Sequence, residues 1–560
     1  MSKSVLVLLL VLAGMAGAMV SPDLRERLVT AAPDEYLAVN VVLKEQFDAG
    51  LLASLVEGLP KPQRRAETAR VLKEFSDRAQ AGLVAALEPG GARDIMPLWV
   101  VNAVYCEATP ELIRLVAERP DVDYVSYDLS YAPDVLEEPG ESVPPSDEIP
   151  WGVQKINAPA VWTQGYTGQG IVVGIIDTGC DYTHPDFADH LWTDSNYPFH
   201  GWDFENNDND PMDDQGHGTN TAGFAGSDGT AGSQCGAAPD ARLMICRVRT
   251  MADTISESQV WAAMQFCVAP PLSPASGADS YLTTLGWLIS WNPQQATWRT
   301  TMDNLLATGL SQVVSAGSEG NSNPPYNLRC PGNVPPPWWN PQNTGVGALS
   351  GAVACGATDS SDYIASMSSQ GPVTWGTVTP FNDYPYPPGL TKPEVCAPGI
   401  NVKTTQLGGG YTVVSGTSWA TAYVAGAVAL ILSKNSTLSP AAVDSLLETS
   451  AVDRGPSGKD NTYGAGRIDV LAAVTGVAEG SSTPNARRLT LKAEPNPFRS
   501  VCRVSPVAPV EVLDASGRRV ATVTSGVWRP GATAETGVYF IRQRSAAGGE
   551  RSVVRVTYIR

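Results

Sequence analysis

An apolar run at residues 171–176, which ends in the carboxylate of Asp177, constrains the fold of this 560-residue chain most strongly. Five of its six residues are apolar, a pattern typical of a strand buried on both faces of a parallel sheet. Strand-like and helical stretches alternate over residues 243–356, which favours an α/β fold with helices on both faces of the sheet. Functional sites in such sheets lie at the carboxyl ends of strands, so Asp177 is a candidate site residue.

Two further segments supply a base and a hydroxyl. His217 stands between two glycines ahead of a helical pattern, and Ser418 precedes a run of small residues, 420–429. A serine hydroxyl attacks a carbonyl only when a base removes its proton, and histidine titrates near neutrality. A carboxylate behind the imidazole fixes the tautomer of the ring. We therefore predict Ser418 as nucleophile, His217 as general base and Asp177 as orienting carboxylate.

For other histidines and for most carboxylates, the sequence indicates structural or surface roles and not catalysis. Of the other histidines, His184 and His200 stand beside prolines in loop-like segments, which favour local structural or surface roles. With 57 acidic residues in the chain, an arbitrary carboxylate is a solvated surface group. Asp177 differs because a charge at the end of a buried strand requires a partner.

The segments 171–179, 214–219 and 415–420 resemble those of the subtilisin-like serine peptidases (subtilases), in which Asp, His and Ser follow in this order. The resemblance implies a subtilisin-like parallel sheet with helices on both faces. It also implies a secreted serine endopeptidase that hydrolyses peptide bonds through an acyl-enzyme. Residues 281–286 should then border the substrate as an extended strand. The substrate-binding residues expected there are Thr284, Leu285 and Gly286.

One position departs from the family pattern. Subtilases stabilise the oxyanion with the N–H of the nucleophile and an Asn side chain, and Ser318 stands where that Asn is usual. The expected oxyanion hole therefore consists of the Ser418 N–H with Ser318 or Asn321 as second donor. The alternative is an attenuated or inactive subtilase-fold protein, exported as a binding protein.

Composition and charge limit the possible partners. The net charge of −19 argues against nucleic acid and anionic membrane surfaces. Lys3, the apolar run 5–12 and the small residues 16–18 predict a signal peptide over residues 1–18. No later segment has eighteen consecutive apolar residues, so we expect no stable membrane span. The nine cysteines include no Cys-x-x-Cys spacing, which argues against zinc, and their pairing is not readable from the sequence.

Six acidic residues crowd the approach to His217 and suggest structural Ca²⁺, because this ion prefers oxygen ligands. A solvated acidic loop is the alternative, and catalysis should need no cofactor. The six residues are Asp203, Glu205, Asp208, Asp210, Asp213 and Asp214.

The chain is expected to divide into several parts. These are a signal peptide (1–18), an N-terminal unit (19–131), an acidic Pro-rich linker (132–150), a peptidase domain (151–475), a second linker (476–487) and a C-terminal β-sandwich (488–560). In the N-terminal unit we expect strands at 35–43, 99–106 and 122–127 and helices at 62–87 and 110–118.

The two flanking parts carry resemblances of their own. The β–α–β–α–β order of the N-terminal unit resembles the ferredoxin-like inhibitory propeptide of subtilases. The short alternating strands of residues 488–560 are similar to the sorting domains of type IX secretion. A generic α+β module and an accessory β-domain are the alternatives.

These resemblances imply a monomeric precursor with two kinds of partner besides protein or peptide substrates. Its own propeptide should act as an intramolecular inhibitor, and secretion machinery should bind the C-terminal domain. The protein would then be secreted by, or displayed on, a Gram-negative-type bacterium.

Overall fold

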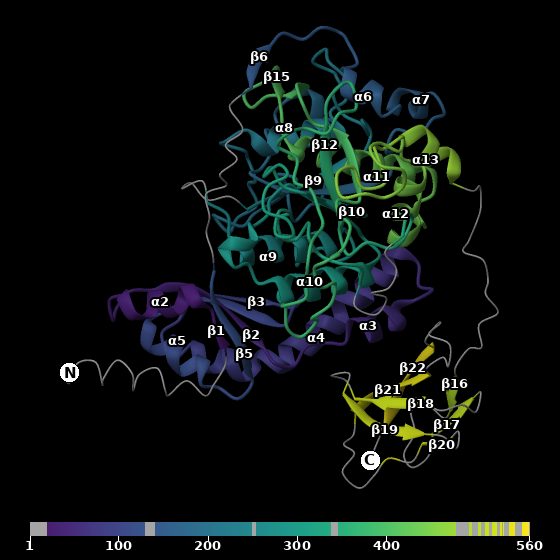
Figure 1. Cartoon of the computed structure of the whole chain (residues 1–560). Helices are drawn as coiled ribbons and strands as arrows, with labels where there is room; N and C mark the ends of the chain where they lie inside the picture. Colours follow the sequence, from purple (N-terminus) through teal and green to yellow (C-terminus); the bar gives the residue numbers. More distant parts are fainter. Residues whose placement is uncertain are drawn as a thin grey trace. The chain divides into compact units, whose positions relative to one another are not determined.

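The computed structural model describes residues 19–128, 140–248, 254–337 and 345–477, together with strand segments between 492 and 558 (Figure 1). The chain forms two compact units, residues 1–127 with 481–560 and residues 128–480. The expected signal peptide, residues 1–18, lies outside the described residues. No helix among the described residues is long and apolar enough to cross a membrane.

Residues 19–127 fold as a five-stranded sheet with four helices. The strand order is β1-β5-β2-β4-β3, with β1 parallel to β5 and the other pairs antiparallel. The strands are β1 (Met19–Val20), β2 (Leu37–Leu43), β3 (Arg93–Leu98), β4 (Ala103–Ala108) and β5 (Val122–Tyr127). The helices are α2 (Pro22–Thr30), α3 (Ala49–Val56), α4 (Lys61–Leu87) and α5 (Pro110–Ala117).

The second expected strand of this region begins later than its pattern indicated. Residues 99–106 were expected to be extended, but β4 starts only at Ala103. Residues 99–102 turn the chain back after β3, and Asn102 adopts a positive φ of 45° there. Asn tolerates this left-handed conformation better than most residues, so the turn is encoded at Asn102.

The unit of residues 128–480 is built on a seven-stranded sheet in the order β13-β12-β11-β10-β7-β9-β8, with all neighbours parallel. The strands are β7 (Val172–Asp177), β8 (Gly201–Asp203), β9 (Arg242–Arg247), β10 (Ser280–Thr283), β11 (Ser311–Ser315), β12 (Val353–Thr358) and β13 (Val395–Pro398). The helices are α6 (Trp151–Lys155), α7 (Ala158–Trp162), α8 (His217–Gly226), α9 (Glu257–Val268), α10 (Gln295–Thr308), α11 (Thr417–Lys434), α12 (Pro440–Thr449) and α13 (Val470–Gly476). The predicted α/β fold is confirmed.

Alternate residues of β7 face the two helical layers. Val173 and Ile175 belong to one buried cluster with Phe224 of α8 and Val424 of α11. Gly174 faces the other side, where a Cβ atom would lie 2.5 Å from the Sγ atom of Cys267 in α9. A side chain at this position would overlap the helix, so glycine allows α9 to lie close to the sheet.

The strand register brings the candidate residues to one edge of the sheet. Thr283 at the end of β10 is paired with Ile176 of β7 and with Val314 of β11. The next residues along these three parallel strands are therefore neighbours, and they are Thr284, Asp177 and Ser315. Helices α8 and α11 contact each other and β7, and they begin at His217 and Thr417 (Figure 1).

Part of the expected linker packs against the peptidase unit. Strand β6 (Glu141–Val143) pairs antiparallel with β15 (Tyr411–Val414), which also pairs with β14 (Val402–Thr405). Lys403 donates hydrogen bonds to Ser146 and to Glu148 over 2.7 and 3.2 Å. The acidic composition of residues 132–150 predicted a linker throughout. Within it, however, residues 141–143 form a strand, and Ser146 and Glu148 bind Lys403.

The C-terminal strands form two antiparallel sheets. The orders are β16-β17-β20 and β19-β18-β21-β22, an arrangement compatible with the expected β-sandwich. The strands are β16 (Lys492–Glu494), β17 (Cys502–Ser505), β18 (Val510–Leu513), β19 (Arg519–Val523), β20 (Val527–Trp528), β21 (Gly537–Gln543) and β22 (Ser552–Tyr558).

Eight cysteines lie among the described residues between 19 and 477. They form no disulfide, and all are buried. They are Cys106, Cys180, Cys235, Cys246, Cys267, Cys330, Cys355 and Cys396. The sulfur atoms of Cys246 and Cys267 lie 3.9 Å apart. These side chains act as small apolar residues of the core.

Candidate active site

Asp177 is fully buried at the end of β7, and both of its carboxylate oxygens accept hydrogen bonds. Oδ1 accepts from His217 Nδ1 and from the Thr178 N–H, each over 2.8 Å. Oδ2 accepts from Thr284 Oγ1 over 2.6 Å and from Thr221 Oγ1 over 3.0 Å. Burial alone would raise the pKa of Asp177, but the charge of His217 and these bonds outweigh it and lower that pKa. The site therefore holds a carboxylate anion.

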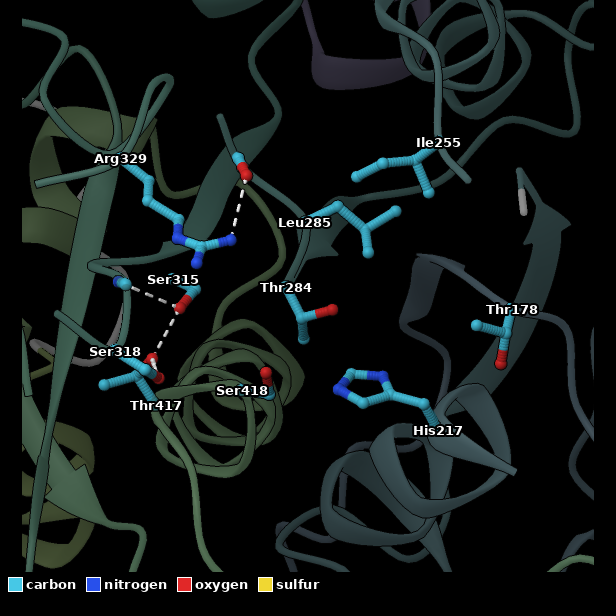
Figure 2. A pocket seen from close by; sticks show the side chains of 12 residues that line it. Thr178, His217, Ile255, Thr284, Leu285, Ser315, Ser318, Arg329, Thr417 and Ser418 are labelled. Carbon is cyan, nitrogen blue, oxygen red and sulfur yellow. Dashed lines mark hydrogen bonds between the residues drawn. The ribbon is translucent and has the colours of Figure 1, made fainter. Parts of the chain in front are cut away.

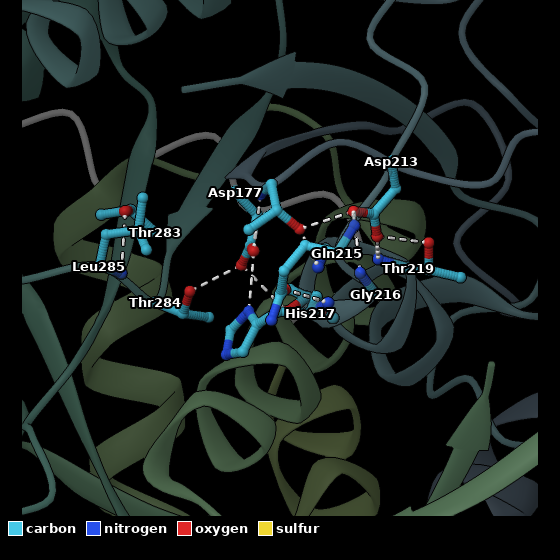
Figure 3. Close-up of polar contacts among 12 residues, drawn as sticks. Asp177, Asp213, Gln215, Gly216, His217, Thr219, Thr283, Thr284 and Leu285 are labelled. Carbon is cyan, nitrogen blue, oxygen red and sulfur yellow. Dashed lines mark hydrogen bonds and ion pairs between the residues drawn. The ribbon is translucent and has the colours of Figure 1, made fainter. Parts of the chain in front are cut away.

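His217 is the first residue of α8, and Asp213 organises the turn that delivers it (Figure 3). Asp213 Oδ1 accepts from the N–H groups of Gln215 and Gly216 over 3.0 Å. Asp213 Oδ2 accepts from the N–H and the hydroxyl of Thr219. Gly216, with a φ of 106°, makes the sharp turn into the helix. The buried carboxylate thus caps the helix start and fixes where His217 leaves the backbone.

Ser418 lies in the first turn of α11 and lines a pocket together with His217. Figure 2 shows the Ser418 hydroxyl and the His217 ring facing each other. The His217 ring also packs on Trp419, with 4.6 Å between ring centroids, which limits its rotation. Nδ1 of His217 is engaged with Asp177, and Nε2 is the ring nitrogen on the side of Ser418. The structure thus brings together the three predicted residues.

The two expected oxyanion donors occupy different positions. Ser318 lines the pocket, and its Oγ lies 3.2 Å from Thr417 Oγ1. Thr417 Oγ1 in turn lies 2.8 Å from Ser315 Oγ. Asn321 is exposed and is not among the pocket-lining residues.

Residues 281–286 were expected to border the substrate as an extended strand, but the first three of them lie inside the sheet. Residues 281–283 belong to β10, whose two edges are already paired with β7 and β11. A further strand cannot pair with backbone groups that are engaged on both sides. Thr284, Leu285 and Gly286 follow the strand and line the pocket.

The acidic approach to His217 does not fit a Ca²⁺ site. Its carboxylates already accept protein donors: Asp203 binds Arg247 and two backbone N–H groups, and Asp214 binds Arg247 over 2.9 Å. Asp213 caps α8, and Asp210 accepts from Tyr182. Among the described residues, the one group with the geometry to hold a metal is Asp189, His190 and Asp228.

Comparisons with known proteins agree with this geometry. A model of the subtilase family (peptidase S8) matches residues 168–466, a span that contains Asp177, His217 and Ser418, and the chain belongs to this family. It is 29% identical to subtilisin E of Bacillus subtilis over 67% of this chain and 81% of that protein. It is 28% identical to an alkaline protease of Alkalihalobacillus alcalophilus over 63% of this chain and 76% of that protein. Bacillopeptidase F of Bacillus subtilis is 26% identical over 75% of this chain and 29% of its own length. The protein is a serine-type endopeptidase.

Sequence reasoning missed the residues that hold Asp177 and the start of α8. Thr284 was expected only to border substrate, yet its hydroxyl binds Asp177 Oδ2. Asp213 was grouped with metal ligands, and Thr221 was not singled out at all. Thr221 lies one helical turn after His217, a spacing that returns its side chain to the same face.

We expect Thr284→Val to lower kcat/KM by about 10-fold to 100-fold, because a hydrogen bond to a charged group contributes about 1.5–3 kcal/mol. The substitution also removes the hydrogen bond from Thr284, which is one cause of the low pKa of Asp177. The pKa of Asp177 should therefore rise. A lowered carboxyl pKa stabilises the folded state above its unfolded pKa, and this contribution disappears as pH falls through the folded pKa. Acid unfolding of the variant should therefore begin at higher pH.

Peptide hydrolysis and acid unfolding followed by circular dichroism measure these two effects. Thr284→Ser keeps the hydroxyl and should restore both values. Wild-type behaviour of Thr284→Val in both measurements would contradict a role for this bond.

Proposed function

We propose that this endopeptidase works through Asp177, His217 and Ser418. His217 Nε2 removes the proton of Ser418 as the hydroxyl attacks the peptide carbonyl, and Asp177 stabilises the imidazolium. His217 then protonates the leaving amine, and an acyl-enzyme remains on Ser418. Water, activated by the same ring, hydrolyses this ester. The observation that carries the proposal is the 2.8 Å bond from His217 Nδ1 to the buried Asp177, with Ser418 on the opposite side of the ring.

A fluorophosphonate probe, which reacts with activated serines, should label the purified protein. Ser418→Ala should abolish labelling and peptide hydrolysis. Ser433→Ala removes another hydroxyl from the same helix, bound to its own backbone, and should leave both unchanged. Equal labelling of wild type and Ser418→Ala would refute the assignment of the nucleophile.

The proposed oxyanion hole combines the Ser418 N–H with the hydroxyl of Ser318. The first N–H groups of a helix lack intrahelical acceptors and attract negative charge. The three hydroxyls of Ser315, Thr417 and Ser318 can align as successive donors, so that the Ser318 hydrogen remains for the oxyanion. Such a chain polarises its last donor, which compensates in part for the missing amide.

We expect Ser318→Ala to lower kcat by about 10²-fold with little change in KM, because a transition-state donor contributes about 2.7–4 kcal/mol. Thr417→Val should cause a smaller loss by removing the hydroxyl that orients Ser318. Single-turnover kinetics with a peptide ester measures the step directly. The exposed neighbour Ser322, changed to Ala, is the control, and full activity of Ser318→Ala would exclude its hydroxyl as donor.

The alternative of an inactive binding protein is not favoured. It rested on Ser318 alone, whereas His217 is hydrogen-bonded to Asp177 and lines the same pocket as Ser418. A structural Ca²⁺ ion stays a proposal that rests on the family likeness alone. The described residues offer no support for it in the acidic approach to His217.

We also propose that the protein is made as a secreted, autoinhibited precursor. Residues 1–18 would direct export, and the α+β part over residues 19–131 would act as inhibitory propeptide and folding template. Within the peptidase unit, Asp128 accepts hydrogen bonds from the N–H and hydroxyl of Ser258 at the start of α9. This contact, made by the residue directly after β5, supports the proposal. The C-terminal strands would form a sorting domain for passage to the surface of a Gram-negative-type bacterium.

Two deletions test these roles in the native host. Loss of residues 19–131 should yield misfolded, inactive protein, because the template for folding is absent. Loss of residues 488–560 should leave active enzyme in the periplasm. Activity assays of periplasmic and external fractions separate the two outcomes, and normal surface delivery of the second truncation would refute the sorting role.

A further inference from the structure

An arginine lines the pocket that contains Ser418. Arg329 lies on the side of Ser418 away from His217, and its side chain extends toward Leu285 and Ser315 (Figure 2). Its side chain is only 7% exposed. A cation that is largely shielded from water needs hydrogen-bond acceptors, so the contacts of Arg329 indicate which groups the pocket can accept.

The backbone fixes Arg329 between two walls of the pocket. Its N–H donates to the carbonyl of Ala316 over 3.1 Å, while the next residue, Cys330, exchanges two hydrogen bonds with Trp287. Glycines flank the arginine stem on both sides. A Cβ at Gly286 would lie 3.0 Å from Arg329 Cβ, and one at Gly317 would lie 2.9 Å from Arg329 Cγ. Side chains on either wall would displace Arg329, so the pocket is shaped around it.

Glu319 and a carbonyl use part of the guanidinium. Arg329 Nε and Nη2 both donate to Glu319 Oε1, over 2.9 and 2.6 Å, and Nη1 donates to the Gly286 carbonyl over 3.3 Å. Arginine carries five N–H donors. Within the part of the chain that the structure describes, these bonds leave one N–H on each terminal nitrogen for a further acceptor.

The carboxylate of Glu319 is better satisfied than its partner. Oε1 accepts twice from Arg329, and Oε2 accepts from Ser369 Oγ over 2.9 Å. Arg329 lines the pocket whereas Glu319 does not, so the pair presents the unused donors of Arg329 to the pocket. An incoming carboxylate that binds the guanidinium edge lies closer to this cation than to Glu319, so the net Coulomb interaction is attractive.

We propose that Arg329 selects substrates with an acidic residue at P1, the residue whose carbonyl Ser418 attacks. This inference rests on the proposed role of Ser418 and names the substrate class of that site. A Glu or Asp side chain would complete the charge-assisted bonds of Arg329. An apolar P1 side chain would bury the guanidinium edge without an acceptor, and a basic one would meet like charge.

The test compares kcat/KM for peptide anilides that differ only at P1, with Glu, Gln, Leu, Phe or Lys. Wild type should cleave the Glu substrate at least about 10-fold faster than the Gln and Leu substrates. Arg329→Ala should lose about 100-fold on Glu and gain on Leu and Phe. Arg329→Lys, which keeps the charge, should retain part of the Glu preference. Glu319→Gln removes the competing anion and should keep or raise that preference.

Labelling by a fluorophosphonate without a P1 side chain gives the concentration of active enzyme for every variant. Arg454→Ala, which breaks an ion pair with Asp362 outside the pocket, is the matched control and should keep the wild-type P1 order. A wild type that prefers Phe, Leu or Lys, or an Arg329→Ala variant with the wild-type order, overturns the proposal while labelling persists. Absence of labelling in wild type would instead overturn the role of Ser418, and with it this inference.

Discussion

The buried carboxylate of Asp177 is the interaction on which the rest of the site depends. A charge at the end of a central strand is tolerated only when several donors surround it. Four donors do so here, and they come from the residue after β7, from two turns of α8 and from the residue after β10. Because separate elements must converge to solvate one anion, any fold that buries Asp177 correctly also positions His217.

Close packing of small residues brings the second half of the site into range. Helices α8 and α11 contact each other, and both are rich in Ala and Gly over their buried faces. In α8, Gly223 lies so near Thr405 that a Cβ would come within 2.2 Å of its hydroxyl. Trp419, next to Ser418, packs between the rings of His217 and Phe224. The base and the nucleophile are thus held by one continuous packed layer.

The strongly patterned parts of the site were readable from the sequence. The apolar strand before Asp177, the glycine-flanked His217 and the small-residue helix after Ser418 each carry a local signal. Thr284 and Asp213 carry none, and Thr221 carries only its spacing from His217, because a threonine or aspartate in a polar segment looks the same whether it faces solvent or a buried charge. The same holds for residues 141–143, which lie in an acidic stretch that resembles a linker but whose backbone pairs with β15.

The sequence alone determined the fold class and predicted the three residues of the triad, because periodicity, turn glycines, strand-end polarity and the likeness to subtilases are all carried by short segments of the chain. The tertiary structure decided which donors hold Asp177, that Ser318 faces the pocket while Asn321 does not, and that Arg329 lies in its wall. Arg329 is 89 positions before Ser418, and no local pattern sets the two side by side. Their proximity follows from the register of β10 and β11 and from the backbone bonds of Arg329 and Cys330, which exist only once the sheet has formed.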